Sequence, residues 1–289
     1  MTALGKILVI RFSSIGDIVL TTSLITTLRK TFSNFEIHYL TLDKFSSILE
    51  FHPEIDRVIE LNSNSNLKDL LEFNNFIKSS NYNRIFDLHG SIRSRLITKG
   101  IGQSISRVKK PRFLRFILFQ FHINMFPSNF SAMHMYHNCL EENESIEFPK
   151  TFLSVSDLEQ KNAISFLKKN NVEGRFIAIV PGAAWPQKQW GVAKYSKAIT
   201  KIMSRSNKSV VLLGTEKDKI NNEIEKINNQ VVNLTGKTNL RQAMSVLSLS
   251  DTVLGSDTGL VHIAEALGKS VNMILGPTTK DTGGGVSLS

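Results

Sequence analysis

The sequence predicts an α/β protein made of two doubly wound domains that face a cleft. Buried-strand patterns alternate with helix patterns in the first half of the chain, and the alternation restarts in the second half. An acidic stretch at 141–156, which contains Pro149, separates the two halves. A chain of 289 residues is long enough for two domains of ordinary size. We therefore expect one domain at residues 1–150 and a second at 151–289.

The individual elements follow from hydrophobic periodicity. In the first half we expect strands at 7–12, 37–40, 57–61 and 84–88, with helices at 17–30 and within 64–80. In the second half we expect strands at 176–180, 210–213, 230–234, 252–254 and 271–275, with helices at 157–170, after 191, at 240–247 and from about 258. In sheets of this kind ligands bind beyond the carboxyl ends of the strands, so the residues that follow each strand are the candidates for a site.

The segment Gly255–Gly268 is the most informative of these strand ends. Two glycines, an acid and two hydroxyl residues precede a helix whose apolar face is spaced as in a packed helix. Such a loop leaves the first N–H groups of the helix free for a diphosphate, with His262 one turn inside. The alternative is an ordinary strand-turn-helix in which Asp257 or Ser256 only caps the helix.

A second candidate is Asp17, which follows the first strand after Ser13, Ser14 and Gly16. A carboxylate there can accept a proton from an attacking hydroxyl, and Gly16 lets a ligand approach the backbone. The alternative is that Asp17 caps its own helix.

Two further strand ends carry polar residues. In the loop at 181–191 the small residues Gly182, Ala183 and Ala184 leave room for a ligand, and Lys188 supplies a cation for a phosphate. Trp190 in that loop is expected to anchor the next helix. Glu216 follows the next strand and suits the hydroxyls of a ribose, or it is simply an acid at a helix N-terminus.

Positive charge is concentrated in one segment of the chain. The net charge is +10, and no acid lies between Asp87 and Glu141, where the following basic residues occur: Arg93, Arg95, Lys99, Arg107, Lys109, Lys110, Arg112 and Arg115. Such a field attracts polyanions such as nucleic acid, anionic lipid or a phosphorylated substrate. The apolar run 113–121 is either a buried helix or a surface that meets a membrane. Nucleic acid is disfavoured, because the aromatic and basic residues form no known binding module.

Other classes are excluded by what the sequence lacks. A single cysteine, no signal-peptide pattern and no run long enough to cross a bilayer predict a cytoplasmic protein. There is no metal-binding Cys/His spacing, no P-loop, no nucleophile elbow and no Gly-x-Gly-x-x-Gly after the first strand. We therefore expect no metal and no cofactor.

Taken together, the strand-end motifs resemble those of the lipopolysaccharide heptosyltransferases of glycosyltransferase family nine. The motifs are Ile10–Asp17, Pro181–Ala183 with Lys188 and Trp190, Gly214–Glu216, and Ser256–His262 with Gly276–Thr278. They occur in the family's order and span nearly the whole chain. The resemblance implies a GT-B fold, with residues 1–150 binding the acceptor and 151–289 binding a nucleotide-activated sugar, typically ADP-heptose.

The resemblance also implies roles for single residues. Asp17 is the general base, Lys188 binds the diphosphate and Glu216 binds the ribose. The remaining donor-binding residues are Gly182, Ala183, Ala184, Asp257, Thr258, Gly259 and His262. Some relatives have hydroxyl residues in place of the two alanines, so phosphate contacts there come from the backbone. The expected acceptor-binding residues are Ser13, Ser14, Gly16, Arg93, Arg95, Lys109, Lys110 and Arg112.

The sequence thus predicts an inverting glycosyltransferase that moves heptose from ADP-heptose to the anionic lipopolysaccharide inner core. It would act at the inner face of the cytoplasmic membrane, in peripheral contact with it. The alternative is an impaired member of the same fold that binds sugar nucleotide or glycolipid without turnover. A weaker third reading is a nucleic-acid binder. Family members continue past the Gly-Pro-Thr motif, whereas this sequence stops at a glycine-rich tail. From that we expect a shortened enzyme that closes poorly and turns over slowly.

Overall fold

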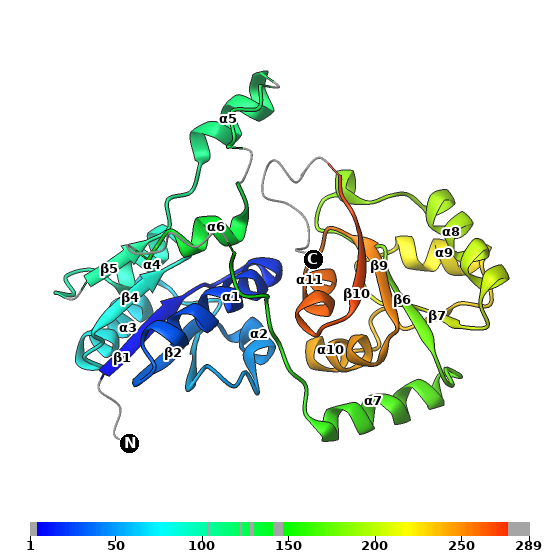
Figure 1. Ribbon diagram of the computed structural model, residues 1–289, viewed down its shortest axis with the longest axis horizontal. Helices are drawn as coiled ribbons and strands as arrows, with labels where there is room; N and C mark the ends of the chain where they lie inside the picture. The colour runs from blue at the N-terminus through cyan, green and yellow to red at the C-terminus, as the bar shows by residue number, and fades with distance from the viewer. Residues whose placement is uncertain (1–4, 103, 122, 128–129, 141–146, 277–289) are drawn as a thin grey trace. The chain divides into compact units, whose positions relative to one another are not determined.

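The computed structural model describes residues 5–102, 104–121, 123–127, 130–140 and 147–276. The chain divides into two compact units, Met1–Thr151 and Phe152–Ser289. Each unit is built on a five-stranded parallel sheet, with strand orders β3-β2-β1-β4-β5 and β10-β9-β6-β7-β8 (Figure 1). In both sheets the first strand of the unit is central. The next two strands are added on one side of that strand, and the last two are added on the other side. The predicted doubly wound fold is confirmed.

The first unit contains the following elements. Its strands are β1 (Gly5–Ile10), β2 (Phe35–Leu42), β3 (Arg57–Leu61), β4 (Arg84–Asp87) and β5 (Ser104–Arg107). Its helices are α1 (Ile15–Thr31), α2 (Asp43–Ser46), η1 (Ser47–Leu49, a 3-10 turn), α3 (Leu67–Ser79), α4 (Ile92–Ile97), α5 (Arg112–Phe121) and α6 (Ala132–His137).

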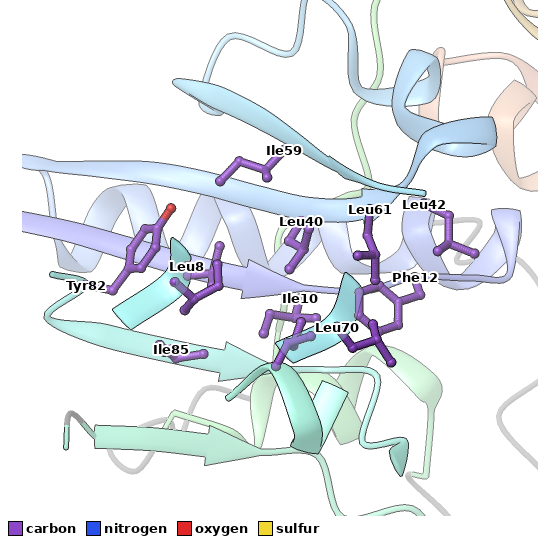
Figure 2. Close-up of a cluster of buried hydrophobic side chains, with 12 residues drawn as sticks. Leu8, Ile10, Phe12, Leu40, Leu42, Ile59, Leu61, Leu70, Tyr82 and Ile85 are labelled. Atoms are coloured by element: carbon purple, nitrogen blue, oxygen red, sulfur yellow. The ribbon is translucent and has the colours of Figure 1, made fainter. Parts of the chain in front are cut away.

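Both faces of the first sheet are buried. Leu8, Ile10 and Phe12 lie in one hydrophobic cluster with side chains from β2, β3, β4 and α3 (Figure 2). Ile7 and Val9 alternate with them along β1 and are equally buried. A strand covered on both faces reads as a continuous apolar run, which is why β1 was recognisable in the sequence.

The second unit repeats the pattern. Its strands are β6 (Phe176–Val180), β7 (Ser209–Leu212), β8 (Val232–Asn233), β9 (Thr252–Ser256) and β10 (Ser270–Ile274). Its helices are α7 (Asp157–Lys169), η2 (Pro186–Lys188, a 3-10 turn), α8 (Val192–Arg205), α9 (Ile220–Ile227), α10 (Leu240–Leu249) and α11 (Gly259–Ala266). The core of this unit includes side chains of β6, β7, α8 and α9, and Trp190 packs against it as expected.

The structure bears on one open alternative, whether the run 113–121 is a buried helix. The apolar run 113–121 forms α5, and the side chains of Phe113, Phe116 and Phe121 are exposed rather than buried. In the part of the chain that the structure describes, no helix is long and apolar enough to cross a membrane. Pro277, Thr278 and the glycine-rich tail, to which the expectation of a shortened enzyme refers, lie outside the described residues.

Candidate active site

Asp17 lies in the first turn of α1, just beyond the carboxyl end of the central strand β1. One carboxylate oxygen, Oδ2, is 2.5 Å from the Arg11 guanidinium and accepts a hydrogen bond from the Ser14 hydroxyl at 2.8 Å. The other oxygen, Oδ1, accepts a hydrogen bond from the Tyr136 hydroxyl at 2.6 Å. Arg11 is itself fixed by donating to the Leu88 carbonyl, just past β4. The carboxylate therefore lies beyond the carboxyl ends of β1 and β4, between which the strand order of the sheet reverses. Sheets of this kind bind ligands at that point.

These contacts decide the protonation state of Asp17. Burial by itself raises the pKa of the Asp17 carboxyl group. The charge of Arg11 and the hydrogen bonds from Tyr136 and Ser14 together lower it by more than burial raises it, so the pKa of Asp17 is below the usual value. Burial raises the pKa of Tyr136 well above its ordinary value, so the phenol stays protonated and donates a hydrogen bond to Asp17. Asp17 also accepts from the Ser14 backbone N–H at 3.2 Å. The capping role considered from the sequence is thus present, and it leaves the carboxylate ionised.

Two further groups surround Arg11 and Asp17. The Lys110 ammonium donates to the His89 carbonyl, with an N–O distance of 2.5 Å, and burial followed by repulsion from Arg11 lowers its pKa. The His89 ring packs on Phe12 at 4.9 Å between centroids. Burial, followed by Arg11 and Lys110, lowers the pKa of His89 to about 4. The imidazole is therefore neutral at neutral pH, and Lys110 is a predicted acceptor cation whose pKa the charge of Asp17 also influences.

Asp87, at the end of β4, has a structural task. Its fully buried carboxylate accepts hydrogen bonds from the Gly90 N–H at 2.8 Å and the Ser94 hydroxyl at 2.9 Å. The Arg107 guanidinium lies 3.4 Å from the same group. Arg107, a member of the basic segment, is thus a counterion for a buried carboxylate rather than a free surface cation.

The other predicted acceptor residues are spread over the first unit. Arg93 is half-buried and points to the Ser63 carbonyl at 3.4 Å. Arg95, Lys109 and Arg112 are exposed. Ser13 and Ser14 lie in the β1–α1 connection, and Gly16 lies in the first turn of α1 next to Asp17. The structure therefore groups Ser13, Ser14, Gly16 and Lys110 with Asp17, and the exposed Arg112 is near enough to Lys110 to help lower its pKa.

In the second unit, Lys188, Asp257 and His262 come together. The Lys188 ammonium donates to Asp257 Oδ2 at 2.6 Å, and His262 Nε2 is 3.4 Å from Asp257 Oδ1. Lys188 belongs to the loop after β6, and Asp257 follows β9, its neighbour in the sheet. Gly276, which follows β10, approaches this loop closely, because a Cβ there would lie 3.0 Å from the Lys188 Cα.

The N-terminus of α11 adjoins this cluster. Thr258, not Asp257 or Ser256, is the N-cap, and its side chain makes no capping hydrogen bond. Ser256 instead donates to the Pro181 carbonyl at 3.0 Å and ties β9 to β6. Among the described residues, the N–H groups of Gly259 and Leu260 have no hydrogen-bond partner. Free N–H groups beside a lysine are what a diphosphate requires.

The loop after β6 differs in one respect from the sequence interpretation. The space beside Gly182 is filled by Asp218, because a Cβ at Gly182 would lie 2.2 Å from Asp218 Oδ1. Asp218 is held there by the N–H and hydroxyl of Thr215. Gly182 is therefore needed to accommodate Asp218, and not to leave room for a ligand. Ala183 is half-buried and Ala184 exposed.

Glu216 lies in the turn after β7 with its side chain exposed. Its Cγ packs over Gly236, where a Cβ would come within 2.5 Å. The acid in the first turn of α9 is Glu223, so Glu216 is not the helix N-terminal acid that the sequence left open. Glu216 thus stands at the carboxyl end of a strand next to β6, with a carboxylate that faces solvent.

Sequence reasoning missed several of these groups. Arg11 was visible within the first motif, but nothing in the sequence indicated its role, because a buried arginine is recognised only by its partners. Tyr136 carried no signal, since it meets Asp17 across 119 positions of the chain. Asp218 was hidden in a polar turn.

Two doubly wound parallel units of this kind form the GT-B fold of the solved heptosyltransferase structures, and the charged groups lie beyond the strand ends where such sheets bind ligands. The model of glycosyltransferase family 9 (heptosyltransferase) matches residues 71–288. The chain therefore belongs to glycosyltransferase family 9 and is a transferase of the lipopolysaccharide heptosyltransferase family.

One curated relative and two solved structures are similar to this chain, the structures in fold. Lipooligosaccharide heptosyltransferase 2 of Haemophilus influenzae is 26% identical over 291 residues, which cover 95% of this chain and 84% of that protein. A family 9 glycosyltransferase from Veillonella parvula superimposes with a TM-score of 0.78 at 19% identity, over 94% of this chain and 81% of the other. The ADP-heptose lps heptosyltransferase II of Escherichia coli gives a TM-score of 0.70 at 23% identity, over 96% and 86%.

Proposed function

We propose that this chain is an inverting glycosyltransferase that transfers heptose from ADP-heptose to a hydroxyl of the lipopolysaccharide inner core. In this proposal the second unit binds the donor and the first binds the acceptor. Family membership supports the reaction class, and the E. coli neighbour is named for the ADP-heptose donor.

One observation carries the donor half of the proposal: Lys188 is linked through Asp257 to the start of α11, where the N–H groups of Gly259 and Leu260 have no hydrogen-bond partner among the residues that the structure describes. When the glycosidic bond breaks, its electron pair leaves with ADP and negative charge grows on the diphosphate. A lysine and a helix N-terminus fixed in advance stabilise that charge, which is usually the largest contribution to such a transfer. In this proposal His262 and Asp257 contact the sugar, and Glu216 accepts from ribose hydroxyls.

Asp17 carries the acceptor half. Its ionised carboxylate takes the proton of the acceptor hydroxyl as the oxygen forms its bond to the anomeric carbon. Lys110 lies close enough to raise the local positive charge, which suits an acceptor that bears carboxylates and phosphates. The enzyme would act as a peripheral protein at the inner face of the cytoplasmic membrane, where the exposed cations Arg95, Lys109 and Arg112 would favour the anionic acceptor.

The test follows ADP release with ADP-heptose and a deacylated inner-core acceptor, in parallel with calorimetric ADP binding. Asp17→Asn should lower kcat by about 10²–10⁴-fold and leave ADP affinity near that of the parent. Lys188→Met should weaken ADP binding by about 1–3 kcal/mol, as expected for a charge-assisted contact. ADP-glucose, offered beside ADP-heptose, tests the choice of sugar.

The chain offers matched controls. Asp69 closes the cap of α3 from the same helix position that Asp17 occupies in α1, by accepting from the Asn66 N–H at 2.8 Å. Asp69→Asn should therefore share any capping loss in melting temperature but not the loss of kcat. Lys197, exposed on α8, is the control for Lys188. ADP binding without turnover in the parent would support the impaired-binder alternative instead, and equal effects of both aspartate variants would reduce Asp17 to a cap.

A further inference from the structure

Helix α5 exposes large apolar side chains. Phe113 is 70% exposed, Phe116 57% and Phe121 59%. The rings of Phe116 and Phe121 contact each other edge to face at 6.1 Å between centroids, so they belong to one surface. Ile123 and Met125, each 55% exposed, follow directly in the chain. We call these five residues the aromatic patch. Grouped exposed aromatics, unlike scattered ones, mark an interaction surface.

The charges around the aromatic patch have one sign. Lys109 and Arg112 are exposed at the start of α5, and no acid occurs anywhere between Asp87 and Glu141. Other cations of this segment are engaged: Lys110 donates to a carbonyl and Arg107 faces a buried carboxylate. The exposed cations next to the patch therefore have no acidic neighbour along the chain and favour an anionic partner.

The length of α5 limits what that partner can be. A helix of ten residues is about 15 Å long, which is half the thickness of a bilayer's hydrocarbon core. It can lie flat in the headgroup region with its aromatic side chains inserted, but it cannot cross. In Figure 1, the α5 ribbon stands apart from the helices that cover the sheet of the first unit.

We propose that the aromatic patch and the flanking Lys109 and Arg112 dock the first unit on an anionic lipid surface. Aromatic and aliphatic side chains supply the buried apolar area, and the cations supply attraction to acidic headgroups, the combination used by interfacial helices. The inference rests on the proposed function in one respect, since a lipopolysaccharide acceptor is itself anchored in a membrane. Docking brings the acceptor-binding unit to the surface that holds its substrate.

The experiment measures co-sedimentation of the full chain with vesicles of phosphatidylethanolamine and phosphatidylglycerol, and with vesicles of phosphatidylcholine alone. The parent should bind the anionic vesicles. Phe113→Ser with Phe116→Ser should lower the partition coefficient at least about tenfold, because two aromatic rings lose their burial in lipid. Leu158→Ser with Ile227→Ser is the matched control. These residues are equally exposed but lie on α7 and α9 of the second unit, so the variant should bind like the parent.

Charge is tested separately. Lys109→Ser with Arg112→Ser should weaken binding to anionic vesicles and flatten its dependence on salt, while binding to phosphatidylcholine changes little. If salt has no effect on the binding of the parent protein to anionic vesicles, the electrostatic half of the proposal is wrong.

Two results would overturn the proposal. One is that the parent does not bind anionic vesicles, and the other is that the Phe113→Ser/Phe116→Ser variant binds them as well as the parent does. A parent that is dimeric by light scattering, with a monomeric Phe113→Ser/Phe116→Ser variant, would assign the patch to a second copy of the chain. Turnover of a deacylated, soluble acceptor is measured on the same samples and should be equal in parent and aromatic variant. A failure of the proposed transfer reaction would therefore appear in that assay, independently of the vesicles.

Discussion

The Asp17 carboxylate is held more tightly than proton acceptance alone requires. Arg11, Ser14 and Tyr136 occupy both of its oxygens, and together they keep its pKa below the ordinary value. A lower pKa makes a weaker base but guarantees that the group is ionised at every physiological pH. Tyr136, on a helix that is far from Asp17 in the sequence, contributes to this lowered pKa. It donates a hydrogen bond to Oδ1, whereas Arg11 contacts Oδ2.

We expect Tyr136→Phe to raise the pKa of Asp17, since one hydrogen bond to the ionised form is lost. The acid limb of the kcat profile should move to higher pH, while the KM for ADP-heptose stays unchanged. The measurement is kcat across the acidic range. Tyr39→Phe is the control, because Tyr39 is fully buried in the same unit but bonds to Thr21 instead of Asp17. An identical shift in both variants would mean that the profile reports general loosening of the unit.

For single residues, the sequence predicts which side chains follow the strands but not which side chains they contact. Asp17 and Lys188 are predicted as site residues because they follow predicted strands, and the structure places both beyond the carboxyl ends of central strands. Their catalytic and binding roles stay predictions. Tyr136 could not be found in this way, because only the packing of α6 on α1 brings it to Asp17.

Helix α6 fixes α1 through two adjacent residues. Beside Tyr136, the buried His137 contacts the hydroxyl of Ser23 on α1 at 3.1 Å, and Ser23 donates its only proton to the Pro149 carbonyl. Ser23 therefore accepts from His137, which places a proton on Nε2. The His137 ring also stacks on Phe148 at 4.2 Å. One neutral imidazole thus links α1, α6 and the segment that leads to the second unit.

Burial, followed by repulsion from His134, lowers the pKa of His137 from 6.5 to about 4. Between those values the unfolded chain binds a proton that the folded chain does not, so stability falls as the pH falls from about 6.5 toward 4. The contribution of this residue is at most about 3 kcal/mol. His137→Gln, which can still donate to Ser23, should flatten the fall of the melting temperature between neutral pH and pH 5. Parallel curves for the two proteins would contradict this assignment.

Prediction of the elements succeeded where burial leaves a pattern. β3 and β6 were predicted at their observed bounds because apolar residues dominate them. β5, with the sequence Ser-Ile-Ser-Arg, was missed since an edge strand with polar residues is held by its pairing to β4 and not by its own pattern. For α5 the apolar run was evident in the sequence, but its exposure was not. Hydrophobic periodicity does not indicate whether an apolar helix face is covered by other parts of the protein.

On the scale of the whole chain, charge is distributed very unequally. Most of the net charge of +10 comes from the segment between Asp87 and Glu141, and the rest of the chain is nearly balanced. Lys109 and Arg112 are exposed in this segment, whereas Lys188 is mostly covered. Exposed charges are screened by salt far more than covered ones.

Raising the ionic strength from about 0.05 to about 0.5 M should therefore increase the KM for a deacylated acceptor several-fold. The KM for ADP-heptose should change much less, because Lys188 acts at short range. Steady-state kinetics with each substrate varied in turn make the measurement. Equal increases for both substrates would indicate a general effect of salt on the enzyme and remove the basic segment from acceptor binding.

The loop between β6 and α8 holds both tryptophans of the chain, Trp185 and Trp190, on either side of Lys188. Trp190 packs edge-on against the Tyr195 ring at 5.3 Å, whereas Trp185 is 66% exposed. Intrinsic tryptophan emission from this protein therefore originates entirely in the loop assigned to the donor, with one indole packed against the core and one mostly exposed to water. The native fluorescence is in effect a spectroscopic label on that loop, already in place without any chemical modification.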